Sequence, residues 1–206
     1  MKIKRTANAG VLLAISGETF LLDGVCGEVY PYIKTPQHIR EEIEKSYPDN
    51  VLFTHYHDDH YDKAFAKDYE LKTLRSVIGP ESQIVKGTNG AQIISVPTRH
   101  IGKSDFPHVS FIIKKEESVW FMGDVSALAL KEMKNYEKPD VLIVPYACVN
   151  TLSSVKSIKE VGAKKIVVLH LPERKKDEYK LWAAVEKCTE NEENIFIPEM
   201  GEIIDL

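Results

Sequence analysis

The stretch Phe53–Asp62, "FTHYHDDHYD", places three histidines and three aspartates just behind an apolar run. The whole chain has only seven histidines. His55 and His57 are two residues apart, so their side chains point to the same side of an extended segment. Imidazole and carboxylate groups are the ligands that Zn²⁺ takes in proteins. A solvated loop rich in histidine and aspartate is the alternative that this stretch alone leaves open.

Three other apolar runs end in the same way. His100 ends "IISVPTRH", Asp124 ends "VWFMGD" and His170 ends "IVVLH". A sheet brings the ends of its strands together, and sites form at the carboxyl ends of those strands. We therefore expect these side chains and the histidine-rich stretch to share one site.

The other apolar runs predict sheets in a single domain that spans residues 1–206. "GVLLAISG" and "ETFLLDGV" are joined by the residues Ser16, Gly17 and Glu18, which is typical of a hairpin. Several later runs are rich in valine and isoleucine without alternation, as strands buried on both faces are. The predicted fold class is α/β, or α+β.

Helices are expected between some of these strands. The segment 35–48 predicts a helix with Thr35 as N-cap and Pro36 at the first helical position. The segments 152–163 and 175–191 have apolar residues spaced for one buried face. These helices would cover the sheets.

The net charge, the cysteines and the lengths of the apolar runs argue against several classes of protein. The net charge of −4 gives no electrostatic reason to expect nucleic acid as the main partner. The three cysteines form no closely spaced pair, which favours a reducing compartment. No signal peptide is convincing and no apolar run approaches the length of a membrane span, so we expect a cytoplasmic protein.

The order of the candidate ligands resembles a known family. "THYHDDH" matches the H-x-H-x-D-H signature of the metallo-β-lactamase fold hydrolases, and the later histidines and aspartate follow in that family's order. The opening hairpin "GETFLLDG" is also similar to the family's first strand pair. The stretch from Asp140 to His170 is similar to the branch that includes ascorbate-6-phosphate lactonase.

The resemblance implies a four-layer αββα sandwich of two mixed sheets covered by helices, with two metal ions at its edge. By the family's pattern, one metal would be held by His55, His57 and His100, and the other by Asp59, His60 and His170, with Asp124 bridging them. Iron-containing members usually have glutamate where this chain has His57. The cofactor expected is therefore two Zn²⁺, with manganese or iron as alternatives.

Such a site predicts hydrolysis. A zinc-bound water has a pKa of about 7, against about 15.7 for bulk water, and the resulting metal-bound hydroxide attacks a carbonyl or phosphoryl centre. Asp59 and Asp124 would be the catalytic carboxylates. We expect a small, anionic substrate such as a lactone, another ester or a phosphodiester. A nuclease or nucleotide phosphodiesterase and a non-catalytic metal-binding protein are the alternatives.

Residues near the ligands are candidates for binding the substrate. Arg99, followed closely by Lys103, could hold a carboxylate or phosphate. His108 and Tyr146 are further candidates, although a structural role is the more ordinary one for His108 and packing is the more ordinary one for Tyr146. Thr151 is expected to be a helix N-cap. The sequence contains no signal for the oligomeric state.

Overall fold

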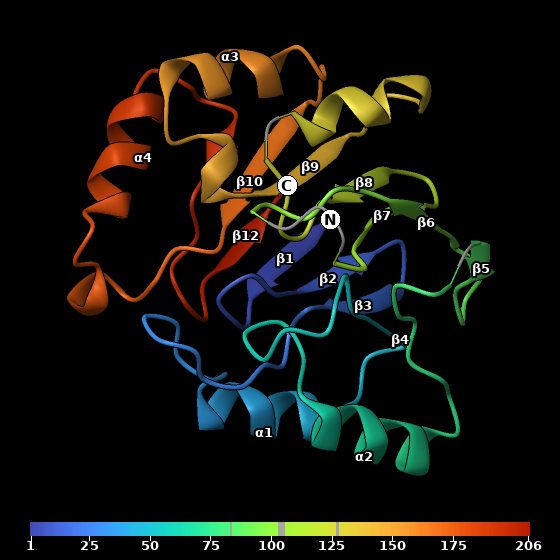
Figure 1. Ribbon diagram of the computed structural model, residues 1–206. Coiled ribbons are helices and arrows are strands. Elements are labelled where there is room, and N and C mark those ends of the chain that lie inside the picture. Colours follow the sequence, from blue (N-terminus) through green and yellow to red (C-terminus); the bar gives the residue numbers. More distant parts are fainter. Residues whose placement is uncertain (83, 103–105, 127) are drawn as a thin grey trace.

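Two mixed β-sheets form the centre of the protein (Figure 1). The computed structural model describes all residues except 83, 103–105 and 127. Within the described residues, the first sheet has five strands in the order β12 (Ile203–Asp205), β1 (Lys2–Arg5), β2 (Val11–Ile15), β3 (Glu18–Leu22) and β4 (Asn50–Leu52). Strands β2 and β3 form the predicted hairpin, with Leu13 opposite Phe20. Ser16 and Gly17 both have positive φ, at 47° and 76°, as a tight two-residue turn requires.

The second sheet has seven strands in the described part of the chain. Their order is β11 (Ile195–Phe196), β10 (Lys165–Leu169), β9 (Val141–Pro145), β8 (Ser118–Phe121), β7 (Val109–Lys114), β6 (Gln92–Pro97) and β5 (Ile84–Lys86). Every residue of β9 is buried, as the runs without alternation predicted. Side chains of both sheets, among them Leu13, Phe20, Phe111 and Ile143, pack together in one buried cluster between them.

Helices cover the outer faces of both sheets. The α-helices of the described residues are α1 (Gln37–Lys45), α2 (Lys63–Thr73), α3 (Leu152–Lys159) and α4 (Leu181–Thr189), and the short 3₁₀ helices are η1 (Ala129–Asn135), η2 (Tyr146–Cys148) and η3 (Arg174–Lys176). Figure 1 shows α1 and α2 beside the five-stranded sheet and α3 and α4 beside the seven-stranded sheet. The predicted αββα sandwich is therefore confirmed. Each helix among the described residues is too short or too polar to cross a membrane.

Helix boundaries differ from the prediction at three places, one of which is the end of α3 at Lys159, four residues before Ala163. The N-cap of α1 is Pro36 rather than Thr35, whose hydroxyl instead accepts a hydrogen bond from the Cys26 amide at 2.9 Å. Helix α4 begins at Leu181 and not near residue 175, because Asp177 accepts hydrogen bonds from the first amides of the helix. In α3, by contrast, Thr151 is the predicted N-cap and its hydroxyl accepts from the Ser154 amide.

The strand directions determine where the functional side chains meet. Strands β8, β9 and β10 are mutually parallel, and β6 runs the same way because it is antiparallel to β7, which is antiparallel to β8. The carboxyl ends of these four strands therefore lie at one edge of the sheet. In the facing sheet, β3 and β4 are also parallel to each other.

Candidate metal centre

Three histidines form the first cluster at this edge. His55 and His57 follow β4, and His100 follows β6. The Nε2 atom of His55 lies 3.1 Å from Nδ1 of His57, and the rings of His55 and His100 are 4.9 Å apart. One ring nitrogen from each of the three histidines lies within 4.8 Å of the others, close enough to share a metal ion.

A second cluster lies beside the first and consists of Asp59, His60 and His170. The Nε2 atoms of His60 and His170 are 3.1 Å apart, and a carboxylate oxygen of Asp59 lies 3.4 Å from Nε2 of His170. More than a hundred residues of sequence separate His60 from His170. The two sheets therefore bring these side chains together, as we expected from their positions at the ends of predicted strands.

Asp124 lies between the two clusters. Its Oδ1 atom is 3.3 Å from Nε2 of His60 and 3.1 Å from Nε2 of His170. Its Oδ2 atom is 3.7 Å from Nε2 of His100. One carboxylate thus directs a different oxygen at each cluster.

Hydrogen bonds to Nδ1 orient the rings of His60 and His100. Nδ1 of His60 donates to Asp23 at 2.9 Å, and Nδ1 of His100 donates to the Ile101 carbonyl at 2.6 Å. A carboxylate and a carbonyl only accept hydrogen bonds, so each ring carries a proton on Nδ1, and its neutral form presents a lone pair on Nε2. The buried Nε2 of His100 has no hydrogen-bond partner among the described residues.

His55 is oriented through the same buried network. Thr54 donates its hydroxyl proton to Asp23 at 2.6 Å, so its oxygen accepts from Nδ1 of His55 at 2.9 Å. The second oxygen of Asp23 accepts the Thr54 amide at 2.8 Å. Asp23 therefore holds both His55, through Thr54, and His60, and its side chain is fully buried.

The prediction of site residues did not include Asp23, although a signal for it was present. Asp23 follows the apolar strand β3 in the same way that Asp124 follows β8. Its φ of 46° lies in the left-handed region, which aspartate and asparagine tolerate better than most residues. This conformation turns the chain sharply at the end of β3.

The charges of this site favour a cation. Burial opposes the charged form of His170, but the adjacent Asp124 and Asp59 raise its pKa to about 9. Burial also opposes charge on His60, yet Asp124 and Asp23 raise its pKa well above the usual value. Imidazole protons and metal ions compete for the same lone pairs, so a field that stabilises protons here also stabilises a metal ion. The donor set and its electrostatics fit bound metal.

The backbone around His170 is strained and tightly held. His170 has a φ of 64°, in the left-handed region that is unfavourable for a residue with a side chain. Its amide donates to the Asn8 carbonyl at 2.8 Å. The buried guanidinium of Arg5 donates to that carbonyl and, at 2.5 Å, to the Leu171 carbonyl. Strand β1 and the β1–β2 loop thereby hold the segment that carries His170.

His108 lies in a hydrogen-bonded chain behind the site. Its Nε2 accepts the Asp124 amide at 3.0 Å, and its Nδ1 donates to the Thr98 hydroxyl at 2.9 Å. Burial holds the pKa of His108 down, at about 3. Gly123 makes this arrangement possible, since a Cβ there would lie 2.7 Å from Nε2 of His108. Both ring nitrogens are used within the protein, which favours the structural role of His108 over substrate binding.

The other candidates for substrate binding are spread around the edge of the site. Tyr146, at the end of β9, is half-buried, and its ring packs at 6.4 Å from that of His170. Arg99 is exposed and directly precedes His100. Lys103 lies outside the described residues. Cys148 is buried, and burial raises the pKa of its thiol to about 12, as expected of a packing residue.

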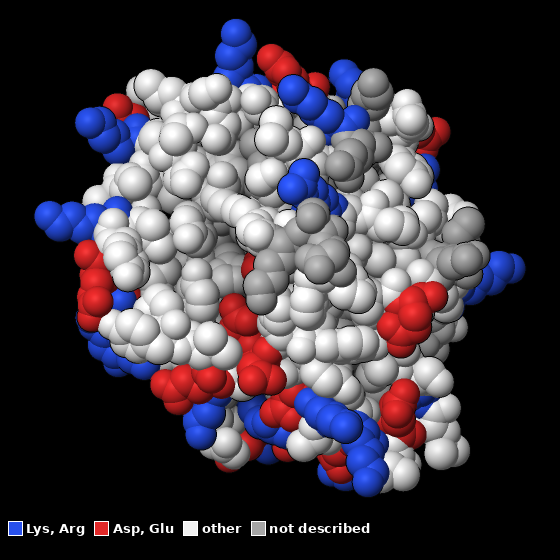
Figure 2. Space-filling model, viewed as in Figure 1, with Lys and Arg blue, Asp and Glu red and all other residues white. Residues whose placement is uncertain are grey.

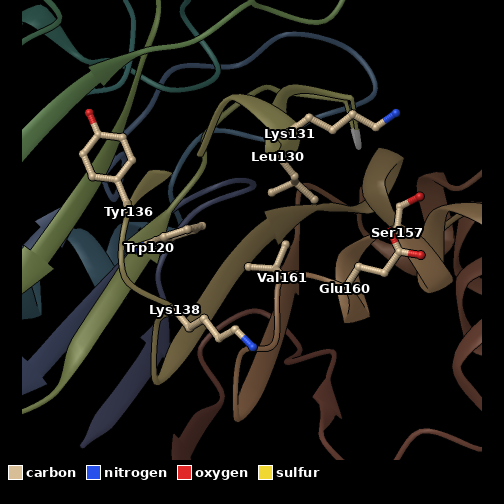
Figure 3. Close-up of a pocket in the computed structure, with 8 residues that line it drawn as sticks. All are labelled: Trp120, Leu130, Lys131, Tyr136, Lys138, Ser157, Glu160 and Val161. Carbon is tan, nitrogen blue, oxygen red and sulfur yellow. The ribbon is translucent and has the colours of Figure 1, made fainter. Parts of the chain in front are cut away.

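Two hollows of the surface help to delimit the site. Figure 2 shows one near the centre of the face that is viewed, with acidic side chains in it and along its lower rim. Figure 3 shows a separate pocket of about 340 Å³ beneath η1 and α3. It is lined by Trp120, Leu130, Lys131, Tyr136, Lys138, Ser157, Glu160 and Val161. None of these residues belongs to the clusters described above.

Solved structures of low sequence identity share the fold. A possible metal-dependent hydrolase from Veillonella parvula has a TM-score of 0.74 at 17% identity, with 100% of this chain and 99% of that chain covered. An isothiocyanate hydrolase from Delia radicum gut bacteria has a TM-score of 0.66 at 17% identity, with the same coverage. CmlA, a diiron β-hydroxylase from Streptomyces venezuelae, has a TM-score of 0.64 at 11% identity. The match covers 100% of this chain but 54% of CmlA.

These structural likenesses establish the fold alone. A comparison with curated proteins found no match. The lactonase-like branch of the family stays a prediction. The family model described as the β-lactamase superfamily domain matches residues 3–170, which is most of the chain. The chain therefore belongs to the metallo-β-lactamase superfamily.

Proposed function

We propose that the protein is a hydrolase that binds two metal ions and acts on a small molecule. His55, His57 and His100 would hold one ion, and Asp59, His60 and His170 the other. The observation that carries the proposal is the position of Asp124, whose two oxygens approach different clusters at 3.1 and 3.7 Å. Such a carboxylate is placed to bridge two cations, because each oxygen can contact one of them.

The metal ions would supply Lewis acidity, which lowers the pKa of water and polarises the bond to be broken. The chain itself supplies orientation. Asp23 and Thr54 hold His55 and His60 with their Nε2 lone pairs free, and the Ile101 carbonyl does the same for His100. Ligands held in this way lose little freedom when they bind, so the site is preorganised.

Proton transfer can be assigned to Asp59. Burial opposes its charge, but His170 and His60 lower its pKa below the ordinary value, so the carboxylate is ionised in the metal-free protein. For an ester, the water oxygen bonds to the carbonyl carbon and the bond from that carbon to the alcohol oxygen breaks. One water proton passes through the Asp59 carboxylate to the departing alcohol.

Zinc is the proposed metal. The two clusters together with Asp124 contribute five imidazoles and two carboxylates, a nitrogen-rich set that suits Zn²⁺. Iron and manganese are the alternatives, and the likeness to the fold of the diiron protein CmlA is one reason to test them.

The experiment that tests the function compares metal-free and metal-loaded protein. Chelator-treated protein is reloaded with Zn²⁺, Mn²⁺ or Fe²⁺ and assayed against lactones, other esters, thioesters, β-lactams and phosphodiesters. We expect at least one class to be hydrolysed only after reloading. The exposed variant Asp205→Asn is the control and should retain that activity. No turnover of any class with any metal would refute the proposed function.

A further inference from the structure

Aromatic side chains stand beside both clusters of candidate ligands. Phe106 packs against the first cluster, with its ring 4.1 Å from that of His57, 5.5 Å from that of His100 and 5.8 Å from that of His55. Phe106 is only partly buried. Part of its ring is therefore available to a molecule that reaches the first cluster.

Tyrosines flank the second cluster. The rings of Tyr32 and His170 pack edge-to-face, with their centres 4.4 Å apart. The ring of Tyr146 also packs against that of His170. Tyr32 and Tyr146 are both half-buried. They offer aromatic faces and hydroxyl groups.

The loop that carries Tyr32 and the segment after His100 extend this apolar character. Val29 and Ile101 are each 40% exposed, so both present apolar surface to the solvent. Val29 is joined to Tyr32 by two backbone hydrogen bonds, so both belong to one small turned loop. Ile101 directly follows His100.

Basic side chains that could hold a distant anionic group are few among the described residues. Arg99, which directly precedes His100, is exposed, and no hydrogen bond or ion pair of its side chain is found within the described residues. Lys176 approaches the Tyr32 loop, but it forms an ion pair with Glu28, with Nζ 3.5 Å from the carboxylate. The metal charge would act on the reacting group, so a second anionic group would need a basic partner of its own.

We infer that the part of the substrate remote from the reacting bond is uncharged and aromatic or bulky apolar, bound by Phe106 on one side and by Tyr32 and Tyr146 on the other. This inference rests on the proposed hydrolase function. It differs from the anionic substrate that the sequence suggested. Phe106, Tyr32 and Tyr146 are then residues that determine substrate specificity.

The test uses paired substrates that share the reacting bond and the leaving group. Within the class that the metal-loaded protein hydrolyses, one member carries a phenyl group and the other a carboxylate. For esters, methyl phenylacetate and monomethyl glutarate form such a pair. We expect kcat/KM for the phenyl member to exceed that for the carboxylate member at least about tenfold, equivalent to about 1.4 kcal/mol.

Variants then assign the effect to the aromatic wall. Phe106→Ala should lower kcat/KM for the phenyl member about tenfold and for the carboxylate member much less, since the lost contact is apolar. Phe106→Leu should restore part of the loss. Tyr136→Ala, which alters an aromatic residue of the separate pocket in Figure 3, should leave the ratio unchanged. Metal content and melting temperature are measured for each variant to exclude misfolding.

The outcomes separate this inference from the function on which it rests. Equal or faster hydrolysis of the carboxylate member, or an equal loss for both members in Phe106→Ala, overturns the inference and leaves the hydrolase function standing. Absence of turnover for every class of substrate removes the proposed function and the inference with it. A phenyl preference that Phe106→Ala abolishes supports both.

Discussion

The substitution Asp23→Asn tests whether the buried network behind the candidate ligands sets their affinity for metal. Asp23 accepts three hydrogen bonds, from the Thr54 amide, the Thr54 hydroxyl and Nδ1 of His60, at 2.6 to 2.9 Å. Asparagine has almost the same shape and also tolerates the positive φ of this position. The change therefore removes the charge and one acceptor atom without adding backbone strain.

The expected magnitude follows from the geometry. An asparagine amide can place its oxygen toward only one set of donors, so its NH₂ group faces either the Thr54 amide or His60. In the first arrangement the NH₂ group of the asparagine faces the buried Thr54 amide, so two donors oppose each other. This should lower the free energy of unfolding by about 2–4 kcal/mol. The second makes Nδ1 of His60 an acceptor and moves the ring proton to Nε2. That proton would occupy the lone pair that points at Asp124 and His170.

Both arrangements should weaken metal binding, by about 10- to 100-fold, as is typical when a hydrogen-bond partner of a metal ligand is lost. The assay is competition for Zn²⁺ against a chelator of known affinity, together with urea unfolding of the metal-free protein. Asp205→Asn, at an exposed aspartate, is the control and should change neither quantity. Wild-type metal affinity and stability in Asp23→Asn would refute the proposed role of the network.

Three further substitutions have expected effects. Asp124→Ala should lower turnover by at least about a hundredfold and reduce the metal content while circular dichroism stays native; unchanged turnover would contradict the bridging role. Glu18→Gln should lower the free energy of unfolding by about 2–3 kcal/mol at neutral pH, because the buried Glu18 carboxylate accepts hydrogen bonds from Asn50 and two backbone amides. Those bonds outweigh burial and lower the pKa of Glu18 below 4.5. Its contribution is therefore present above the unfolded-state pKa and is lost as pH falls through the folded-state pKa, so urea titrations of the two proteins should converge in acid. Thr151→Ala should remove the N-cap bond of α3 and about 1 kcal/mol of stability, seen as a melting temperature about 2–4 °C lower; an unchanged melting temperature would mean that the cap contributes nothing.

Strand direction explains why much of the site could be predicted from sequence. His100, Asp124 and His170 each follow a strand, and parallel strands present their carboxyl ends at one edge of a sheet. The spacing of His55 and His57 required only an extended segment. The lactonase-like branch and the substrate do not follow from these patterns, since they depend on side chains that line the site rather than on the ligands.

Local sequence patterns predicted the structure less well where contacts between distant residues determine it. Helix α2 was not predicted, because only Phe65, Ala66 and Tyr69 face the core among its many charged residues. Thr35 has the chemistry of an N-cap, but the Cys26 amide takes its hydroxyl instead. Asp23 was overlooked as a site residue because its role depends on contacts with His60 and Thr54, which lie far along the chain.

The metal content of the folded protein tests the dinuclear site most directly. Protein purified without chelator and dialysed against Zn²⁺ can be analysed for metal by elemental analysis and for chain concentration by amino-acid analysis. The arrangement of the two clusters around Asp124 predicts two metal ions per chain, and fewer in Asp124→Ala. A folded wild-type protein that retains one ion per chain or fewer, with Zn²⁺, Mn²⁺ and Fe²⁺ each supplied, would contradict it.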